Sequence, residues 1–104
     1  MAQYDVYVNP SNSAAAGIPY VVVIQSELLD ALATRLTVPL SVPDVSIKVP
    51  TALCPIITVK GKRLHALVHY AAPLPAKLLQ RPVDNVAEQS IALASAIDTV
   101  MSAV

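Results

Sequence analysis

The stretch Tyr20-Val21-Val22-Val23-Ile24 decides the fold that this sequence predicts. It is apolar at every position, without the alternation of a half-buried strand. Its β-branched residues favour a strand over a helix. A strand that is apolar on both faces needs cover on both faces. We therefore expect residues 20–24 to form a central strand.

Further elements are expected on both sides of this segment. Towards the N-terminus, Gln3–Val8 alternates with the period of a half-buried strand and ends at Asn9-Pro10. Towards the C-terminus, Ser26 is placed to cap one helical turn over residues 27–30. Such a turn would connect two strands.

Residues 35–40 alternate as well, and they predict a strand with Leu36, Val38 and Leu40 facing inward. Pro39 has no backbone N–H, which predicts that this strand lies at an edge of the sheet or carries a bulge. The following stretch, Val42–Thr51, is interrupted by prolines. We expect it to form an extended loop.

Ile56–Val59 and Arg63–Val68 flank the short connection Lys60-Gly61-Lys62, a pattern typical of a β-hairpin. Lys60, Lys62 and Arg63 form a basic cluster at its tip. We interpret this cluster as a solvated turn, and an electrostatic contact with an acidic partner is the alternative. Further along, Ala76-Lys77-Leu78-Leu79 is the segment with potential to pair with a sheet edge.

The last segment predicts a helix over residues 86–103. Asn85-Val86-Ala87-Glu88 matches a capping box, in which Asn85 accepts from the Glu88 amide and Glu88 reaches back to the Asn85 N–H. Helical spacing then separates a stripe that packs from a stripe that faces water. The packed stripe is Val86, Leu93, Ile97, Val100 and Val104, and the wet stripe is Glu88, Ser95, Asp98, Thr99 and Ser102.

The composition predicts one folded domain over residues 1–104, mainly β, with its strands within 3–70 and a C-terminal helix. The chain has 55% hydrophobic and 13% charged residues and zero net charge. The lack of a basic block disfavours binding to nucleic acid or to a membrane surface. Surplus apolar surface predicts a homodimer. With one cysteine, no signal peptide and no apolar run fit to span a bilayer, we expect a cytoplasmic protein.

No pattern for catalysis or metal binding stands out. Cys54 lies between Leu53 and Pro55 at the start of an apolar strand, and we interpret it as a buried structural thiol. On a strand, His65 and His69 would lie about 13 Å apart, too far for one metal ion. The carboxylates form no facing pair, and two glycines make no phosphate loop. We expect no cofactor, no metal and no enzymatic activity.

Four segments occur in the order found in the CcdB family, toxins of type II toxin–antitoxin systems. They are Gln3 with Val6-Tyr7, Ile24-Gln25-Ser26-Glu27-Leu28-Leu29-Asp30, Arg35-Leu36-Thr37-Val38-Pro39-Leu40, and Cys54-Pro55-Ile56-Ile57. Through them the sequence resembles that family over most of its length. The resemblance implies an SH3-like β-barrel of the CcdB/Kid/MazF type with a C-terminal helix. It also implies a homodimer, a CcdA-like antitoxin, and the DNA gyrase A subunit as target.

The resemblance places the gyrase contact at the C-terminal tail. Family members end in Trp-Gly-Ile, and the aligned residues here are Ser102-Ala103-Val104. The implied gyrase-binding residues are therefore Met101, Ser102, Ala103 and Val104. Because the chain contains no Trp, the alternative is a homologue that keeps the dimer and antitoxin binding but has weak, lost or altered gyrase targeting. A third class is an endoribonuclease like the related Kid and MazF toxins, which the missing His/Arg/Asp constellation disfavours.

Overall fold

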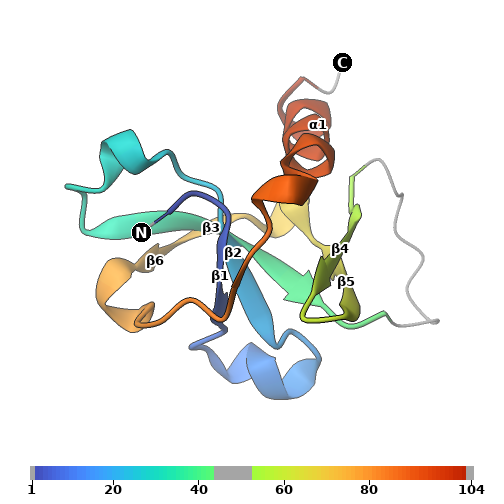
Figure 1. The fold of residues 1–104 in the computed structure, drawn as a ribbon, viewed down its shortest axis with the longest axis horizontal. Coiled ribbons are helices and arrows are strands. Elements are labelled where there is room, and N and C mark those ends of the chain that lie inside the picture. Colours follow the sequence, from blue (N-terminus) through green and yellow to red (C-terminus); the bar gives the residue numbers. More distant parts are fainter. Residues whose placement is uncertain (1, 44–52, 103–104) are drawn as a thin grey trace.

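The computed structural model describes residues 2–43 and 53–102, which form a nearly closed, barrel-shaped antiparallel sheet with a C-terminal helix (Figure 1). This confirms the predicted fold class. The sheet has the order β4-β5-β3-β2-β1-β7, and β6 pairs with β3 beside this path. The elements are β1 (Asp5–Val8), β2 (Tyr20–Val23), β3 (Thr34–Ser41), β4 (Ile56–Val59), β5 (Lys62–Ala66), β6 (Ala72–Pro75), β7 (Asp84–Asn85) and α1 (Ser90–Met101). Short 3-10 turns are η1 (Asn12–Ala16), η2 (Glu27–Leu29), η3 (Val68–Tyr70), η4 (Ala76–Leu78) and η5 (Ala87–Gln89).

Strand β2 is central and covered on both faces, as predicted from its composition. It pairs with β1 on one side and β3 on the other. Val22 belongs to the main core, which also contains Leu93 of α1. Val21 and Val23 belong to a second, smaller cluster that includes Tyr7. The unbroken apolar run is therefore explained by two cores, one on each face of the sheet.

Strand β3 lies inside the sheet, so of the two alternatives predicted from Pro39, an edge position or a bulge, the edge position is wrong. One side of β3 pairs with β2. The other side pairs with β6 through residues 34–37 and with β5 through residues 40–41. Pro39 lies between these two partners, where its carbonyl accepts a hydrogen bond from the Leu67 N–H at 2.9 Å. At this point the strand that pairs with β3 changes from β6 to β5. The missing N–H of Pro39 therefore interrupts no ladder of hydrogen bonds.

The predicted inward face of β3 is also only partly correct. Val38 and Leu40 are fully buried, whereas Leu36 is 38% exposed and Arg35 and Thr37 are buried. The reason is β6, which pairs along the first half of β3. There the Thr37 hydroxyl donates to the Ala72 carbonyl at 3.0 Å. Two polar residues are thus covered on the face expected to be wet.

The hairpin of β4 and β5 forms as predicted, with a tighter turn. Val59 pairs with Lys62, which leaves Lys60 and Gly61 as the two loop residues. Both have positive φ, +50° and +80°, as a type I′ hairpin turn requires. β5 ends at Ala66 because η3 follows. The loop expected over 42–51 lies mostly outside the described residues.

Strand β6 was not predicted, and it lies directly before the segment 76–79 that was expected to pair. Residues 76–78 form η4 instead, and β7 is a second strand beyond residue 70. In β6, Pro73 and Pro75 lie opposite Leu36 and Thr34. Because proline cannot donate to a ladder, these residues protect the outer edge of β6 from pairing with another strand.

The α-helix begins at Ser90 rather than at residue 86, and the predicted capping box is wrong. The Asn85 side-chain oxygen accepts from the Ala87 N–H at 2.9 Å, not from Glu88. The Asn85 N–H donates to Asp84 at 2.8 Å. The Asn85 amide group also donates to the Asp5 carboxylate, because Asp5 lies opposite Asn85 in the β1–β7 ladder. The strand pairing therefore displaces the helix start.

Side chains close the barrel between β4 and the segment that enters α1. The Thr58 N–H donates to the Gln89 side-chain oxygen, and the Gln89 amide donates to the Thr58 carbonyl, both at 2.8 Å. Next to this pair, the Lys60 N–H donates to the Asp84 carboxylate at 3.1 Å. We call these three bonds the closing seam. They occupy backbone groups at the outer edge of β4 that would otherwise be open to another strand.

Candidate functional site

The candidate site at the C-terminal tail begins where α1 leaves the core. Leu93 and Ala96 are buried, and Ile97 and Val100 pack partly against the main core. Met101 is then 80% exposed. The packed stripe is confirmed at Leu93, Ile97 and Val100, while Val86 is buried ahead of α1 and Val104 lies outside the described residues. All members of the predicted wet stripe are exposed, namely Glu88, Ser95, Asp98, Thr99 and Ser102.

Of the four predicted gyrase-binding residues, the structure describes Met101 and Ser102, and both are exposed. Ala103 and Val104 lie outside the described part of the chain. The Ser102 N–H is bonded to the Asp98 carbonyl at 2.8 Å, so the helical backbone holds its position. This end of the helix offers a thioether, a hydroxyl and exposed backbone. Such groups suit recognition by contact area rather than chemical catalysis.

A second exposed apolar surface, which was not predicted from the sequence, lies on the loop of η2. Leu28, Leu29 and Leu32 are 92%, 48% and 53% exposed. Exposed apolar side chains gathered in one place are typical of protein contact surfaces. In the sequence, the feature that could have indicated this surface was the adjacent pair Leu28-Leu29 inside a capped turn between strands. Exposure of these leucines depends on tertiary packing, which local sequence does not report.

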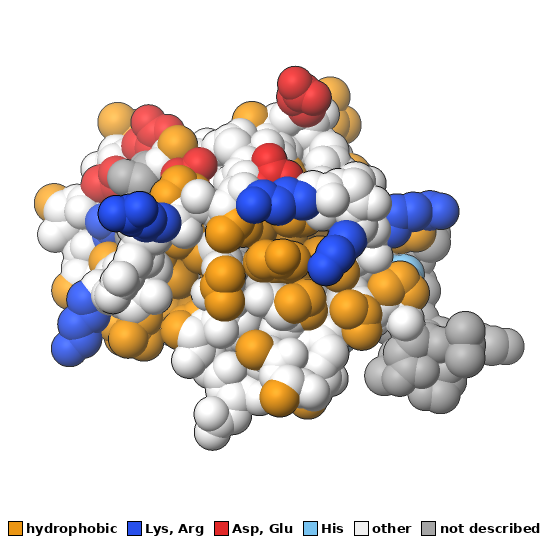
Figure 2. Space-filling model, turned by 60° about the horizontal axis from the view of Figure 1, so that its bottom comes forward, with side chains coloured by type: hydrophobic (Ala, Val, Ile, Leu, Met, Phe, Trp, Pro, Cys, Tyr) orange, Lys and Arg blue, Asp and Glu red, His pale blue; other side chains and the backbone are white. Residues whose placement is uncertain are grey.

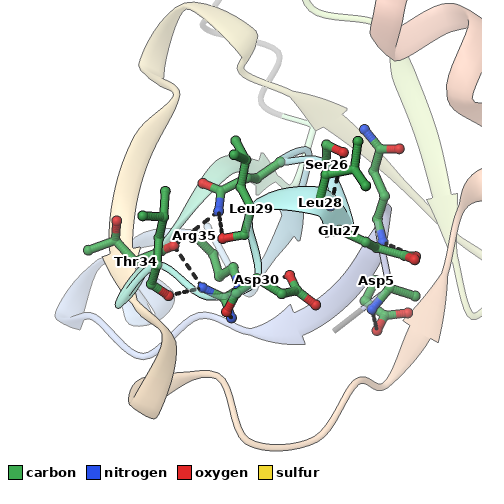
Figure 3. A network of polar contacts seen from close by, with 12 residues as sticks. Asp5, Ser26, Glu27, Leu28, Leu29, Asp30, Thr34 and Arg35 are labelled. Carbon is green, nitrogen blue, oxygen red and sulfur yellow. Dashed lines mark hydrogen bonds and ion pairs between the residues drawn. The ribbon is translucent and has the colours of Figure 1, made fainter.

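Polar contacts hold this leucine loop in place (Figure 3). The Ser26 hydroxyl accepts from the Leu28 N–H at 3.2 Å, which confirms the predicted cap. The buried Arg35 guanidinium donates to the carbonyls of Asp30 and Thr34 at 2.7 and 2.9 Å. Arg35 also lies 3.4 Å from the Asp30 carboxylate. A loop held at several points loses little further freedom when a partner binds.

Cys54 is a buried thiol, as predicted. It is fully buried, and this burial raises the pKa of the Cys54 thiol. Because η3 follows β5, His69 does not continue the strand, and its Nδ1 lies 3.6 Å from the Cys54 sulfur. The Nδ1 of His65 lies 3.4 Å from the Cys54 carbonyl oxygen. Among the residues that the structure describes, no His, Cys, Asp and Glu side chains gather in a group fit to hold a metal ion.

The hairpin tip carries its three cations into solvent, since Lys60, Lys62 and Arg63 are all exposed. At an exposed turn, water and salt screen these charges. Within residues 2–43 and 53–102, no helix is long and apolar enough to cross a bilayer.

The family model of the CcdB protein matches residues 3–103, nearly the whole chain. This range contains every strand and helix given above. No curated protein matches the sequence significantly.

Proposed function

The chain belongs to the CcdB family of toxins from toxin–antitoxin systems, and we propose that it inhibits DNA gyrase by binding its A subunit. In this proposal the protein acts as a homodimer in the cytoplasm, where gyrase acts on DNA, and a CcdA-like antitoxin neutralises it. Inhibition needs binding but no chemical step by the toxin. The proposal therefore requires neither a metal nor a cofactor.

The observation that supports the contact is the exposed end of α1. The core holds the helix up to Val100, whereas Met101 is 80% exposed. We assign the gyrase contact to Met101, Ser102, Ala103 and Val104. A helix fixed at one end presents its last residues to a partner in a defined orientation, which lowers the entropy cost of binding.

The composition of the tail predicts weak poisoning. Family members carry Trp where this chain has Ser102. Trp buries on the order of 200 Å² and is enriched among hot-spot residues, whose truncation costs about 2 kcal/mol or more. A loss of this size weakens binding by about thirtyfold. A CcdB homologue with weak, lost or altered gyrase targeting is therefore the second candidate function.

The test compares the wild-type protein with a Ser102→Trp, Ala103→Gly, Val104→Ile variant in supercoiling inhibition and trapping of gyrase cleavage complexes. We expect the triple variant to inhibit at a concentration about thirtyfold lower. Ser95→Trp is the matched control, because it adds the same side chain to the exposed face of α1 away from the tail. It should give no gain.

Each other result has a definite meaning. Potent poisoning by the wild-type chain, with no gain in the triple variant, would move the gyrase contact away from the tail. A complete lack of inhibition by both proteins would refute gyrase inhibition and leave the second candidate function. An equal gain from Ser95→Trp would show that added apolar area, rather than the tail, is responsible.

A further inference from the structure

The sulfur-containing side chains of this protein differ sharply in their access to solvent. Cys54 is fully buried, and its burial raises the pKa of the thiol. Because the thiolate is the form that oxidants attack, Cys54 is protected from them. Met101 is 80% exposed, and the other methionine, Met1, lies outside the described residues. Within the described chain, the sulfur that an oxidant in solution reaches is therefore that of Met101.

The Met101 thioether is held in the open by an ordered helix. Val100, the residue before it, packs partly against the main core, so the side chain of Met101 points away from the core. The Ser102 N–H donates to the Asp98 carbonyl at 2.8 Å, which keeps the backbone of the last turn helical. A thioether reacts with oxidants without first losing a proton. Oxidation at this position therefore needs neither unfolding nor a change of pH.

The end of α1 offers a partner apolar area rather than positive charge. The helix sequence Ser90–Met101 contains no lysine or arginine, and Asp98 is its one charged residue. Figure 2 shows the Lys and Arg side chains on the body of the barrel. Ser102 adds only a small hydroxyl to this end. Met101 is thus the largest apolar side chain that the described part of the tail presents, and a contact here depends on the thioether staying apolar.

We propose that Met101 is an oxidation site that weakens gyrase binding when its sulfur becomes a sulfoxide. This rests on the proposed function, because gyrase is the partner that would bury the side chain. A peroxide is the oxidant. The sulfur lone pair attacks one peroxide oxygen, an S–O bond forms, and the O–O bond breaks. The proton of the transferred hydroxyl passes to the departing hydroxide, which leaves as water, so the sulfur is oxidised and the peroxide is reduced.

The sulfoxide changes the contact in two ways. It replaces an apolar, flexible side chain by a polar one, and its oxygen is a strong hydrogen-bond acceptor that must be satisfied when a partner covers it. We expect the oxidised protein to bind gyrase about tenfold more weakly. Methionine sulfoxide reductases return the thioether with electrons from thiols. The modification is therefore reversible.

The first arm of the test measures the oxidation itself and does not involve gyrase. The protein is treated with hydrogen peroxide, native and unfolded in urea, and peptide mass spectrometry locates the added oxygen. Met101 in the native protein should oxidise within about threefold of its rate in the unfolded chain, while Cys54 stays unmodified in the native protein. Protection of Met101 by about tenfold or more would overturn the proposal.

The second arm compares gyrase supercoiling inhibition by untreated protein, by oxidised protein, and by oxidised protein restored with a methionine sulfoxide reductase and dithiothreitol. Oxidation should raise the concentration needed for inhibition by about tenfold, and the reductase should reverse this. The matched control is Met101→Leu, which keeps Met1 and Cys54 but has no thioether in the tail. Peroxide treatment should leave its inhibition equal to that of its own untreated sample. An unchanged urea midpoint of the oxidised wild type shows that the fold is intact.

The outcomes separate the site from the proposed function. Equal inhibition before and after oxidation, or an equal loss in Met101→Leu, would overturn the proposal while gyrase inhibition stands. A loss that the reductase does not reverse would overturn it as well, because damage other than the sulfoxide would be responsible. A lack of inhibition by the untreated protein would refute the proposed function and the effect on gyrase with it, whereas the oxidation rates would still report on the exposure of Met101.

Discussion

Replacing Gln89 by Ala removes both hydrogen bonds between its side chain and the backbone of Thr58, and we expect this to destabilise the barrel. The two bonds are each 2.8 Å long and satisfy the outward-facing N–H and C=O of one edge residue. A hydrogen bond contributes about 0.5–1.5 kcal/mol net. Because Thr58 is exposed, water replaces part of what is lost. We therefore expect the free energy of unfolding of the Gln89→Ala variant to be about 1–2 kcal/mol lower than that of the wild type.

The assay is urea denaturation followed by far-ultraviolet circular dichroism, at one fixed protein concentration because a dimer's stability depends on concentration. Glu88→Ala is the matched control, since Glu88 is the exposed neighbour of Gln89. It should change stability by less than about 0.5 kcal/mol. The urea dependence of the free energy should keep its slope in both variants if the fold is unchanged.

Gln89→Glu gives a sharper test of the same contact. A carboxylate at position 89 still accepts from the Thr58 N–H but faces the Thr58 carbonyl without a proton to donate. Folding therefore favours the protonated acid and raises its pKa above the unfolded value of about 4.3. The folded state then binds more protons, so the loss of stability in this variant should shrink as the pH falls through the raised pKa. Two results together would refute the seam as a stabilising feature. The free energy of unfolding of Gln89→Ala would lie within about 0.5 kcal/mol of that of the Glu88→Ala control, and the loss of stability in Gln89→Glu would not depend on pH.

Three further outcomes are expected. Leu93→Ala should lower the free energy of unfolding by about 2–5 kcal/mol, because Leu93 is fully buried, while Ser95→Ala should change it by less than about 0.5 kcal/mol in urea denaturation. Cys54 should react with a thiol reagent only as fast as the protein opens, because burial excludes the reagent and raises the thiol pKa, and fast labelling of the native protein would contradict this. Light scattering at micromolar concentration should give twice the chain mass of 10.9 kDa, whereas the monomer mass would contradict the dimer.

Local contacts explain why several elements were predictable. Val21, Val22 and Val23 are apolar without alternation, and only a strand covered on both faces accommodates that. Lys60-Gly61 closes a hairpin within a few residues, so its conformation depends on neighbours in the sequence. The spacing along α1 likewise identified Leu93 as buried and Ser102 as exposed.

The helix start depended on a residue far away in the sequence. The local sequence predicts Asn85 as the N-cap of a helix, yet the Asn85 amide group donates a hydrogen bond to Asp5, which is 80 positions away in the sequence. A local motif reports which bonds a side chain is able to make, and the tertiary structure decides which of them form. The same reason explains the buried Arg35 and Thr37, which lie in the part of β3 that β6 returns to pair with.

For function, the sequence by itself determined the family and the exposure of Ser102 at the end of α1. The segments that resemble CcdB follow one another along the sequence in the family's order, so they can be recognised without the structure. The family match over residues 3–103 agrees with them. The tertiary structure alone decided which surfaces the barrel presents. The surface groove lined by Val8 and Leu78 joins segments far apart in sequence, and the exposed leucines of the η2 loop depend on what packs beside that loop. Exposure and the shape of a groove depend on what packs next to a residue, and folding rather than local order brings those neighbours together.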